Sequence, residues 1–202
     1  MVCVLSVMNG FGVLVEQMFS EFDPPLLVTS TDSHTFRTDQ QPILALSELD
    51  EIGVVSQQID HTALVRYKDH QVPCRILGVD SLFTQTAHID SVITDGFYSV
   101  YDGAFERTVL GRGLAAQIGI NAHFTGALHL YAPKRIGKVN MLRPDLSLVH
   151  EHAFIAGTFA INQIAYDNQL MLVSLPLSRR LFDFDEHTVT ALRIQPAKGV
   201  SI

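Results

Sequence analysis

The tripeptide His150-Glu151-His152 contains two potential metal ligands. Successive residues of a β-strand point to opposite faces, so both imidazoles would lie on the same face, where they could bind an ion such as zinc. The sequence shows no third ligand, and paired exposed histidines at the start of a strand are the commoner arrangement. We therefore expect no metal and no cofactor in this chain.

Other patterns that could indicate an enzyme are incomplete. Gly111-Arg112-Gly113 precedes a predicted helix, but the next glycine, Gly119, comes three positions too late for a dinucleotide-binding GxGxxG motif. Gly137-Lys138 lacks both the first glycine and the Ser/Thr of a P-loop. The GxSxG, SxxK and HExxH signatures of common hydrolases are missing from the sequence. The charged group Asp183 to His187 is typical of a solvated loop rather than of an acid–base pair. The chain is predicted not to be an enzyme.

Basic residues gather in the segment from Pro133 to Arg143, which holds four of the fourteen lysines and arginines of the chain. These four residues are Lys134, Arg135, Lys138 and Arg143. Prolines at both ends favour a projecting loop, and its charge would suit an acidic partner or lipid headgroups. An ordinary solvated hairpin is the alternative. Pro133, Lys134, Arg135, Lys138 and Arg143 are the predicted partner-binding residues.

The overall composition limits the class of protein. The chain has 202 residues, of which 47% are hydrophobic and 17% charged, with a net charge of -7. This apolar, acidic composition excludes a disordered chain and argues against a nucleic-acid partner, which would require a basic face. Hydrophobic residues also dominate Met1–Met8, a stretch too short to span a bilayer. We interpret residues 1–10 as the end of a truncated transmembrane helix, and a buried first strand is the alternative.

Helices and strands are mixed along the chain without strict βαβ alternation, which favours the α+β class. Helical periodicity is expected over residues 11–22, from Pro42 to Leu49, over 113–118 and over 175–182. Alternating patterns predict two strands between Val54 and Val79, joined by a turn at residues 68–71. Further strands are expected at residues 107–110, 127–131, 154–161 and 188–194, and a buried strand at Leu26–Thr29.

Four stretches of sequence resemble lipoprotein-releasing ABC permeases of the Lol type. Leu5–Phe11 is similar to the end of the first transmembrane helix in those permeases, and Ala153–Phe159 is similar to their F-x-V-x-G-x-F strand. Leu177–Phe182 is similar to a helix near the end of their domain. The fourth stretch, a strand–helix–glycine unit, comprises Val109, Leu110, Gly111, Leu114 and Ile118–Asn121. The likeness covers about residues 5–196.

This resemblance implies the MacB-like periplasmic core domain, which has two lobes. The α/β Porter-like lobe would be discontinuous, formed by residues 11–55 and 152–202 at the two ends of the chain. The inserted β-rich Sabre-like lobe would comprise residues 56–151, with a projecting segment at 133–151. Residues 5 and 198 would then leave the domain at the same end, towards one membrane.

The resemblance also implies a function and partners. The domain would belong to an inner-membrane permease, face the periplasm, and couple ATP hydrolysis by a cytoplasmic subunit to lipoprotein release. A second permease subunit and a periplasmic carrier protein would be its other partners. Two alternatives remain open, namely efflux of the MacB type and an FtsX-like scaffold that activates a periplasmic cell-wall hydrolase.

Overall fold

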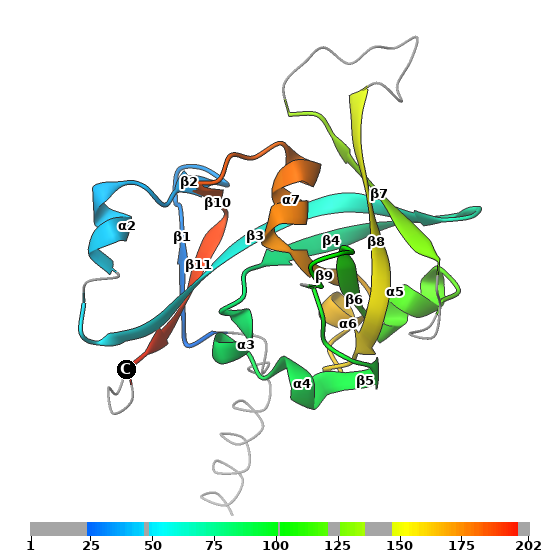
Figure 1. Ribbon diagram of the computed structural model, residues 1–202, viewed down its shortest axis with the longest axis horizontal. Coiled ribbons are helices and arrows are strands. Elements are labelled where there is room, and N and C mark those ends of the chain that lie inside the picture. Colours follow the sequence, from blue (N-terminus) through cyan, green and yellow to red (C-terminus); the bar gives the residue numbers. More distant parts are fainter. Residues whose placement is uncertain (1–23, 47–48, 101, 121–125, 136–146, 198–202) are drawn as a thin grey trace, which may run out of the picture.

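The computed structural model describes residues 24–46, 49–100, 102–120, 126–135 and 147–197. The predicted helix over 11–22, the apolar residues 1–10, and residues 5 and 198 lie outside them. The described elements confirm the α+β class, and Figure 1 shows their arrangement. In chain order these are β1 (Leu26–Thr29), β2 (Phe36–Arg37), α2 (Gln41–Leu46), β3 (Ile52–Tyr67), β4 (His70–Val79), α3 (Phe83–Thr86), α4 (Ile89–Val92), β5 (Ile93–Gly96), β6 (Arg107–Gly111), α5 (Arg112–Gln117), β7 (Ala127–Pro133), β8 (Leu148–Phe159), α6 (Ile164–Asp167), β9 (Leu170–Ser174), α7 (Leu175–Phe182), β10 (Thr188–Val189) and β11 (Ala191–Pro196).

Nine strands form one mixed sheet in the order β1-β11-β3-β4-β9-β6-β8-β5, and β7 pairs with both β3 and β8. The long strand β3 holds the sheet together, because it pairs with β11 from Ile52 to Gln58, with β4 from Gln58 to Tyr67 and with β7 from Leu64 to Arg66. The predicted lobe boundaries at residues 55/56 and 151/152 fall within β3 and β8. The division into Porter-like and Sabre-like lobes stays a prediction.

The hairpin β3–β4 forms as predicted, with a turn shorter than expected. Strand β3 ends at Tyr67 and β4 begins at His70, so only Lys68 and Asp69 connect them. Lys68 has a φ of 51°, as a two-residue hairpin turn requires. Tyr67 and His70 face each other as the last pair of the ladder. Alternation and turn chemistry therefore determine this hairpin locally.

Both faces of the central strands are buried. Ile76 of β4 belongs to a core cluster that includes Leu114 of α5 and Leu177 of α7, whereas the next residue, Leu77, belongs to a second cluster with Phe83 of α3. Because side chains alternate along a strand, these two clusters lie on opposite faces of the sheet. Within the described residues, no helix is long and apolar enough to cross a membrane.

Helix α7 has clear start and stop signals. Ser174 is the N-cap and accepts a hydrogen bond from Leu177 N–H at 3.1 Å, and Pro176 lies in the first turn. Asp183 ends the helix in the left-handed conformation, with φ 55°. Leu177 and Leu181 are fully buried, so α7 packs one face on the sheet. The predicted helix over residues 175–182 is confirmed.

The glycines at the junction of β6 and α5 have structural explanations. A Cβ at Gly111 would lie 2.3 Å from the carbonyl oxygen of Asp167, which belongs to the backbone of α6. A Cβ at Gly113 would lie 1.8 Å from Oδ1 of Asn168. Gly119 ends the turn after α5 with a φ of 72°. Close approach of α6 and a left-handed turn explain these glycines without a nucleotide.

The expectation that Leu26–Thr29 is a buried strand is wrong. β1 is a strand, but Leu26 and Leu27 are 41% and 48% exposed. Among the described strands it lies at the edge of the sheet and pairs with β11, with Leu26 opposite Ile194. An apolar tetrapeptide does not show whether its strand has one neighbour or two. The same pairing places the first described strand directly beside the last.

Cys74 gives a test of this packing. The side chain is 2% exposed, and burial raises the pKa of its thiol to about 12. The thiolate is the reactive form, so the folded protein should react with a thiol reagent at pH 8 about a thousandfold more slowly than the unfolded chain. The rate is measured on a Cys3→Ser variant, in which Cys74 is the remaining cysteine. Equal rates in native buffer and in guanidinium would contradict the packing described here.

Candidate partner-binding hairpin

Strands β7 and β8 form an antiparallel hairpin that extends beyond the sheet, at the top of Figure 1. The pairing runs from Ala127 opposite Phe154 to Pro133 opposite Leu148. Lys134 N–H then donates to the carbonyl of Ser147 at 2.9 Å. Regular pairing therefore continues into both ends of the segment 133–151, although Pro133 lies at its start. Proline lacks only its own N–H, so its carbonyl side and its neighbours can still continue a ladder.

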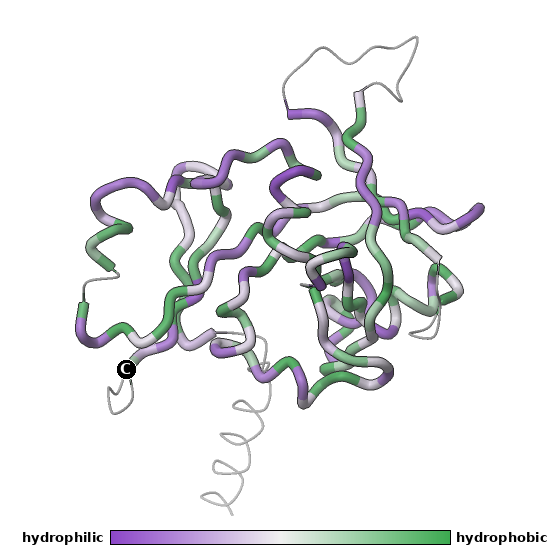
Figure 2. The backbone as a smooth tube through the Cα atoms, viewed as in Figure 1, coloured by the Kyte–Doolittle hydropathy of each residue, from purple (hydrophilic) through white to green (hydrophobic). Residues whose placement is uncertain are grey.

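Three of the five predicted partner-binding residues are described, and all three are exposed. Pro133 ends β7, and Lys134 and Arg135 follow it. Figure 2 shows hydrophilic residues where β7 ends. Lys138 and Arg143 lie outside the described residues. Whether these five residues bind a partner stays a prediction.

Arg135 is held at the base of this segment by an aromatic side chain. Its guanidinium carbon lies 5.3 Å from the ring centroid of Phe184, in the loop after α7. Phe184 also contacts Phe182 and His61, with centroid distances of 6.1 and 6.4 Å. The cation–π contact directs Arg135 towards α7, and contacts of this kind contribute about 0.5–1 kcal/mol at exposed sites.

The hairpin presents a ladder of stacked rings on its outer face. Arg66 lies over the ring of Tyr131 at 5.2 Å, Tyr131 stacks on His150 at 4.8 Å, and His150 stacks on His129 at 5.1 Å. The sequence considered separately did not reveal this ladder. The spacing of His129 and Tyr131, and of His150 and His152, places each pair on one face of its strand. Only the register of β7 against β8 brings the two pairs into contact.

The ladder contains the two histidines that were considered as metal ligands, His150 and His152. The register brings a third imidazole, His129, opposite His152. However, Nδ1 of His129 lies 2.9 Å from Nε2 of His150, a hydrogen-bond distance in which one ring donates to the other. Glu151 instead bonds to Arg180 at 3.2 Å. In the part of the chain that the structure describes, no group of three His, Cys, Asp or Glu residues is arranged to hold a metal ion.

The surroundings of His129 favour its neutral imidazole. Burial lowers the pKa of His129, and the nearby His150 and Arg66 lower it further. His129 is therefore neutral at pH 7 and can share a proton with His150 through their hydrogen bond.

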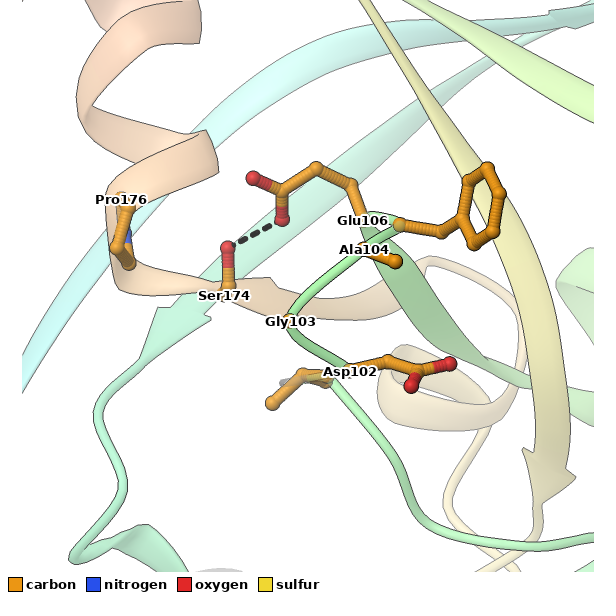
Figure 3. Close-up of a pocket in the computed structure, with 8 residues that line it drawn as sticks. Asp102, Gly103, Ala104, Glu106, Ser174 and Pro176 are labelled. Atoms are coloured by element: carbon orange, nitrogen blue, oxygen red, sulfur yellow. Dashed lines mark hydrogen bonds between the residues drawn. The ribbon is translucent and has the colours of Figure 1, made fainter.

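Helix α7 is tied to the hairpin through Arg180. Its guanidinium bonds to Glu106 at 2.6 Å and to Glu151 of β8 at 3.2 Å. Glu106 in turn accepts a hydrogen bond from Ser174 Oγ at 2.7 Å, and Figure 3 shows this pair beside a pocket of about 230 Å³. Since Ser174 Oγ also caps α7, the Ser–Glu pair has a structural explanation. The network joins α7, the start of β6 and the hairpin.

The fold is shared with solved domains of ABC transporters. Over 86% of this chain and 83% of the other, the structure is similar to the extracellular domain of the ABC-type transporter YknZ from Gram-positive bacteria, with a TM-score of 0.53 and 13% identity. Over 78% of this chain and 64% of the other, it is similar to the periplasmic region of MacB from Actinobacillus actinomycetemcomitans, with a TM-score of 0.50 and 8% identity. No protein-family model matches the chain. No curated protein matches it in sequence.

These similarities define a class of fold, that of the extracytoplasmic domains of ABC-transporter permeases. The chain spans less than two thirds of the MacB region, so that region has parts with no counterpart here. At 8–13% identity the likeness concerns the fold alone.

Proposed function

We propose that this chain is the extracytoplasmic domain of an ABC-transporter permease, anchored in the cytoplasmic membrane and facing the periplasm. The fold that it shares with the YknZ domain is the observation that carries the proposal. The adjacency of Leu26 and Ile194 supports it, since two flanking membrane segments must leave the domain on one side. A cytoplasmic ATPase subunit and a second permease subunit are the partners that such a transporter requires.

The domain would act mechanically and not as an enzyme. ATP hydrolysis in the cytoplasm would rearrange the extracytoplasmic domain and so move the cargo. Arg180 supports such coupling, because it connects helix α7, which packs on the sheet, with Glu151 on the projecting hairpin. We favour lipoprotein release, with the end of the β7–β8 hairpin contacting a periplasmic carrier protein.

Two other functions of the same class remain candidates. Efflux of the MacB type is supported by the similarity to the periplasmic region of MacB. An FtsX-like scaffold that activates a cell-wall hydrolase would use the same mechanical coupling. Depleting the full-length protein in its own cells distinguishes the three functions. Lipoproteins retained in the inner membrane would indicate lipoprotein release, and increased sensitivity to macrolides would indicate efflux of the MacB type. Cells that fail to separate would indicate the FtsX-like scaffold.

The topology is tested with a single reactive cysteine. Lys134→Cys is introduced into the full-length protein together with Cys3→Ser, because Lys134 is exposed at the end of β7. A membrane-impermeant maleimide should label this variant in cells whose outer barrier is opened but whose cytoplasmic membrane is intact. The Cys3→Ser parent is the control for background labelling, since Cys74 is buried. Labelling that requires lysis of the cytoplasmic membrane would refute the extracytoplasmic placement.

The assignment to a transporter has its own test. The full-length protein, purified in mild detergent, should carry an ATP-binding subunit with it and show ATPase activity. A preparation that is labelled from outside but never associates with an ATPase would support an extracytoplasmic domain and rule out the transporter.

A further inference from the structure

The projecting hairpin meets β3 through a short junction, which lies where β7 runs beside β3 in Figure 1. In this β3–β7 junction Leu64, Val65 and Arg66 of β3 face Tyr131, Leu130 and His129 of β7. On its other side, His129 faces His152 of β8. His129 is therefore directly opposite a guanidinium on one neighbouring strand and an imidazole on the other.

The bond between His129 and His150 limits how many protons the two rings can hold. Nδ1 of His129 lies 2.9 Å from Nε2 of His150, so one of these nitrogens donates and the other accepts. An imidazole nitrogen accepts only while it carries no proton. The pair can take up one additional proton and keep this bond, whereas a second proton would leave two donors facing each other.

The charges that act on His129 oppose its protonation. Burial lowers the pKa of His129 most, and the charges of His150, Arg66 and His152 lower it further. These three groups are cations when they are protonated, and Arg66 is a cation throughout the physiological range. Like charges directly opposite each other on neighbouring strands weaken the pairing.

The carboxylates of the neighbouring strands have other partners. Glu151 of β8 points to the opposite face of the sheet from His150 and His152, and it bonds to Arg180 of α7. Asp60 of β3 accepts a hydrogen bond from Arg75 of β4 at 2.8 Å. A cation at His129 would therefore have Arg66 opposite it and neither of these carboxylates as a partner.

We propose that the β3–β7 junction is acid-sensitive: a proton taken up by His129 places a cation directly opposite Arg66 and weakens the junction. The other face of β7 keeps Leu128 and Leu130 fully buried in the core, so the change is a local loosening while the domain stays folded. This inference goes beyond the proposed function and does not depend on it, because it rests on the strand register and the ring contacts.

Acid acts on the junction in one direction. In the open junction His129 is exposed and binds a proton at the ordinary pKa of about 6.5, whereas in the closed junction it binds the proton less readily. Acidification below pH 6.5 therefore favours the open form, and between pH 7.5 and 5.5 the opening constant should rise about three- to tenfold. Carboxylates, with ordinary pKa values of about 4, keep their charge over this range.

The test is amide hydrogen exchange of the full chain at pH 7.5 and 5.5, with each rate divided by the intrinsic rate at that pH. Protection of residues 64–66 and 129–131 should fall about three- to tenfold at the lower pH. The pairing of β4 with β9 from Arg75 to Val79 is the internal reference and should keep its protection. His129→Gln should abolish the loss at the junction, because glutamine takes up no proton in this range.

Three further variants separate the facing charge from other effects. Arg66→Gln should reduce the loss of protection, and Arg66→Lys should retain it, because only lysine keeps a cation opposite His129. His70→Gln is the matched control, since His70 is an exposed histidine at the start of β4 that is not stacked in the ladder, and it should behave as the native chain. No loss in the native chain, an equal loss in His129→Gln or an equal loss at the β4–β9 reference would overturn the proposal. A full loss in Arg66→Gln would overturn the role of the facing guanidinium.

A second measurement needs no variant at position 129. An NMR titration of the histidine ring signals of the native chain should show His129 taking up its proton below pH 6.5, over the range in which protection is lost. Uptake of this proton above pH 6.5 would mean that the closed junction stabilises the cation, and would overturn the proposal.

Discussion

Replacing Gly78 by alanine is expected to lower the free energy of unfolding by about 3 kcal/mol. A Cβ at this position of β4 would lie 2.0 Å from Oγ and 2.4 Å from Cβ of Ser178 in α7. Ser178 is fully buried, and its Oγ donates to the Leu175 carbonyl at 2.7 Å, so it cannot rotate away freely. The added methyl group would therefore force α7 away from the sheet. Urea unfolding followed by circular dichroism measures the loss.

The contact can be verified by rescue. Ser178→Gly removes both atoms that a Cβ at position 78 would meet, at a cost of about 1 kcal/mol for glycine in a helix. The double variant should therefore be more stable than Gly78→Ala alone. Gly53→Ala is the control, because its Cβ would meet atoms no closer than 3.1 Å. If Gly53→Ala is equally destabilising, or if Ser178→Gly gives no recovery, the packing of α7 on β4 is not as described.

Reversing the charges at the end of β7 is expected to weaken binding of the proposed periplasmic carrier about tenfold or more at low salt. The variant is Lys134→Glu with Arg135→Glu, and Lys138→Glu is added in a second step. Since these cations favour an acidic partner, reversal should also flatten the salt dependence of binding. The melting temperature should change little, because exposed charges contribute only about 0–1 kcal/mol each. Binding is measured by titration with the purified carrier protein from the same cells.

The matched control is Lys68→Glu with Arg112→Glu, which changes the net charge equally at two exposed positions on the β3–β4 turn and in α5. Equal weakening in both pairs would indicate a general effect of net charge and not a contact by the hairpin. Normal carrier binding and transport after the change at Lys134, Arg135 and Lys138 would leave an ordinary solvated hairpin as the better explanation of the segment.

The position of α7 gives these two predictions a common physical basis. Its buried face packs on the sheet at Gly78, and its exposed Arg180 bonds to Glu151 on the hairpin. The hydrogen bonds that Arg180 donates to Glu106 and Glu151 raise the pKa of its guanidinium, which therefore stays charged throughout the physiological range. A rearrangement of α7 would therefore move the hairpin as well, as the proposed coupling of ATP hydrolysis to cargo movement requires.

Local sequence determined several elements of this protein. The β3–β4 hairpin follows from alternation of apolar residues on both sides of a short polar turn. Helix α7 follows from an apolar face, the N-cap Ser174 and a terminating polar run. In each case the signals act within a few residues, so the element can be predicted without knowing its neighbours. The spacing of Gly111, Gly113 and Gly119 likewise excluded a GxGxxG motif without knowledge of the fold.

Only the tertiary structure decided which residues meet. β1 is exposed because it lies at the edge of the sheet, although its sequence is as apolar as that of an inner strand. His129 reaches His150 through the register of β7 against β8. Strand neighbours and registers depend on contacts between residues far apart in the chain. Periodicity within one segment carries no information about them.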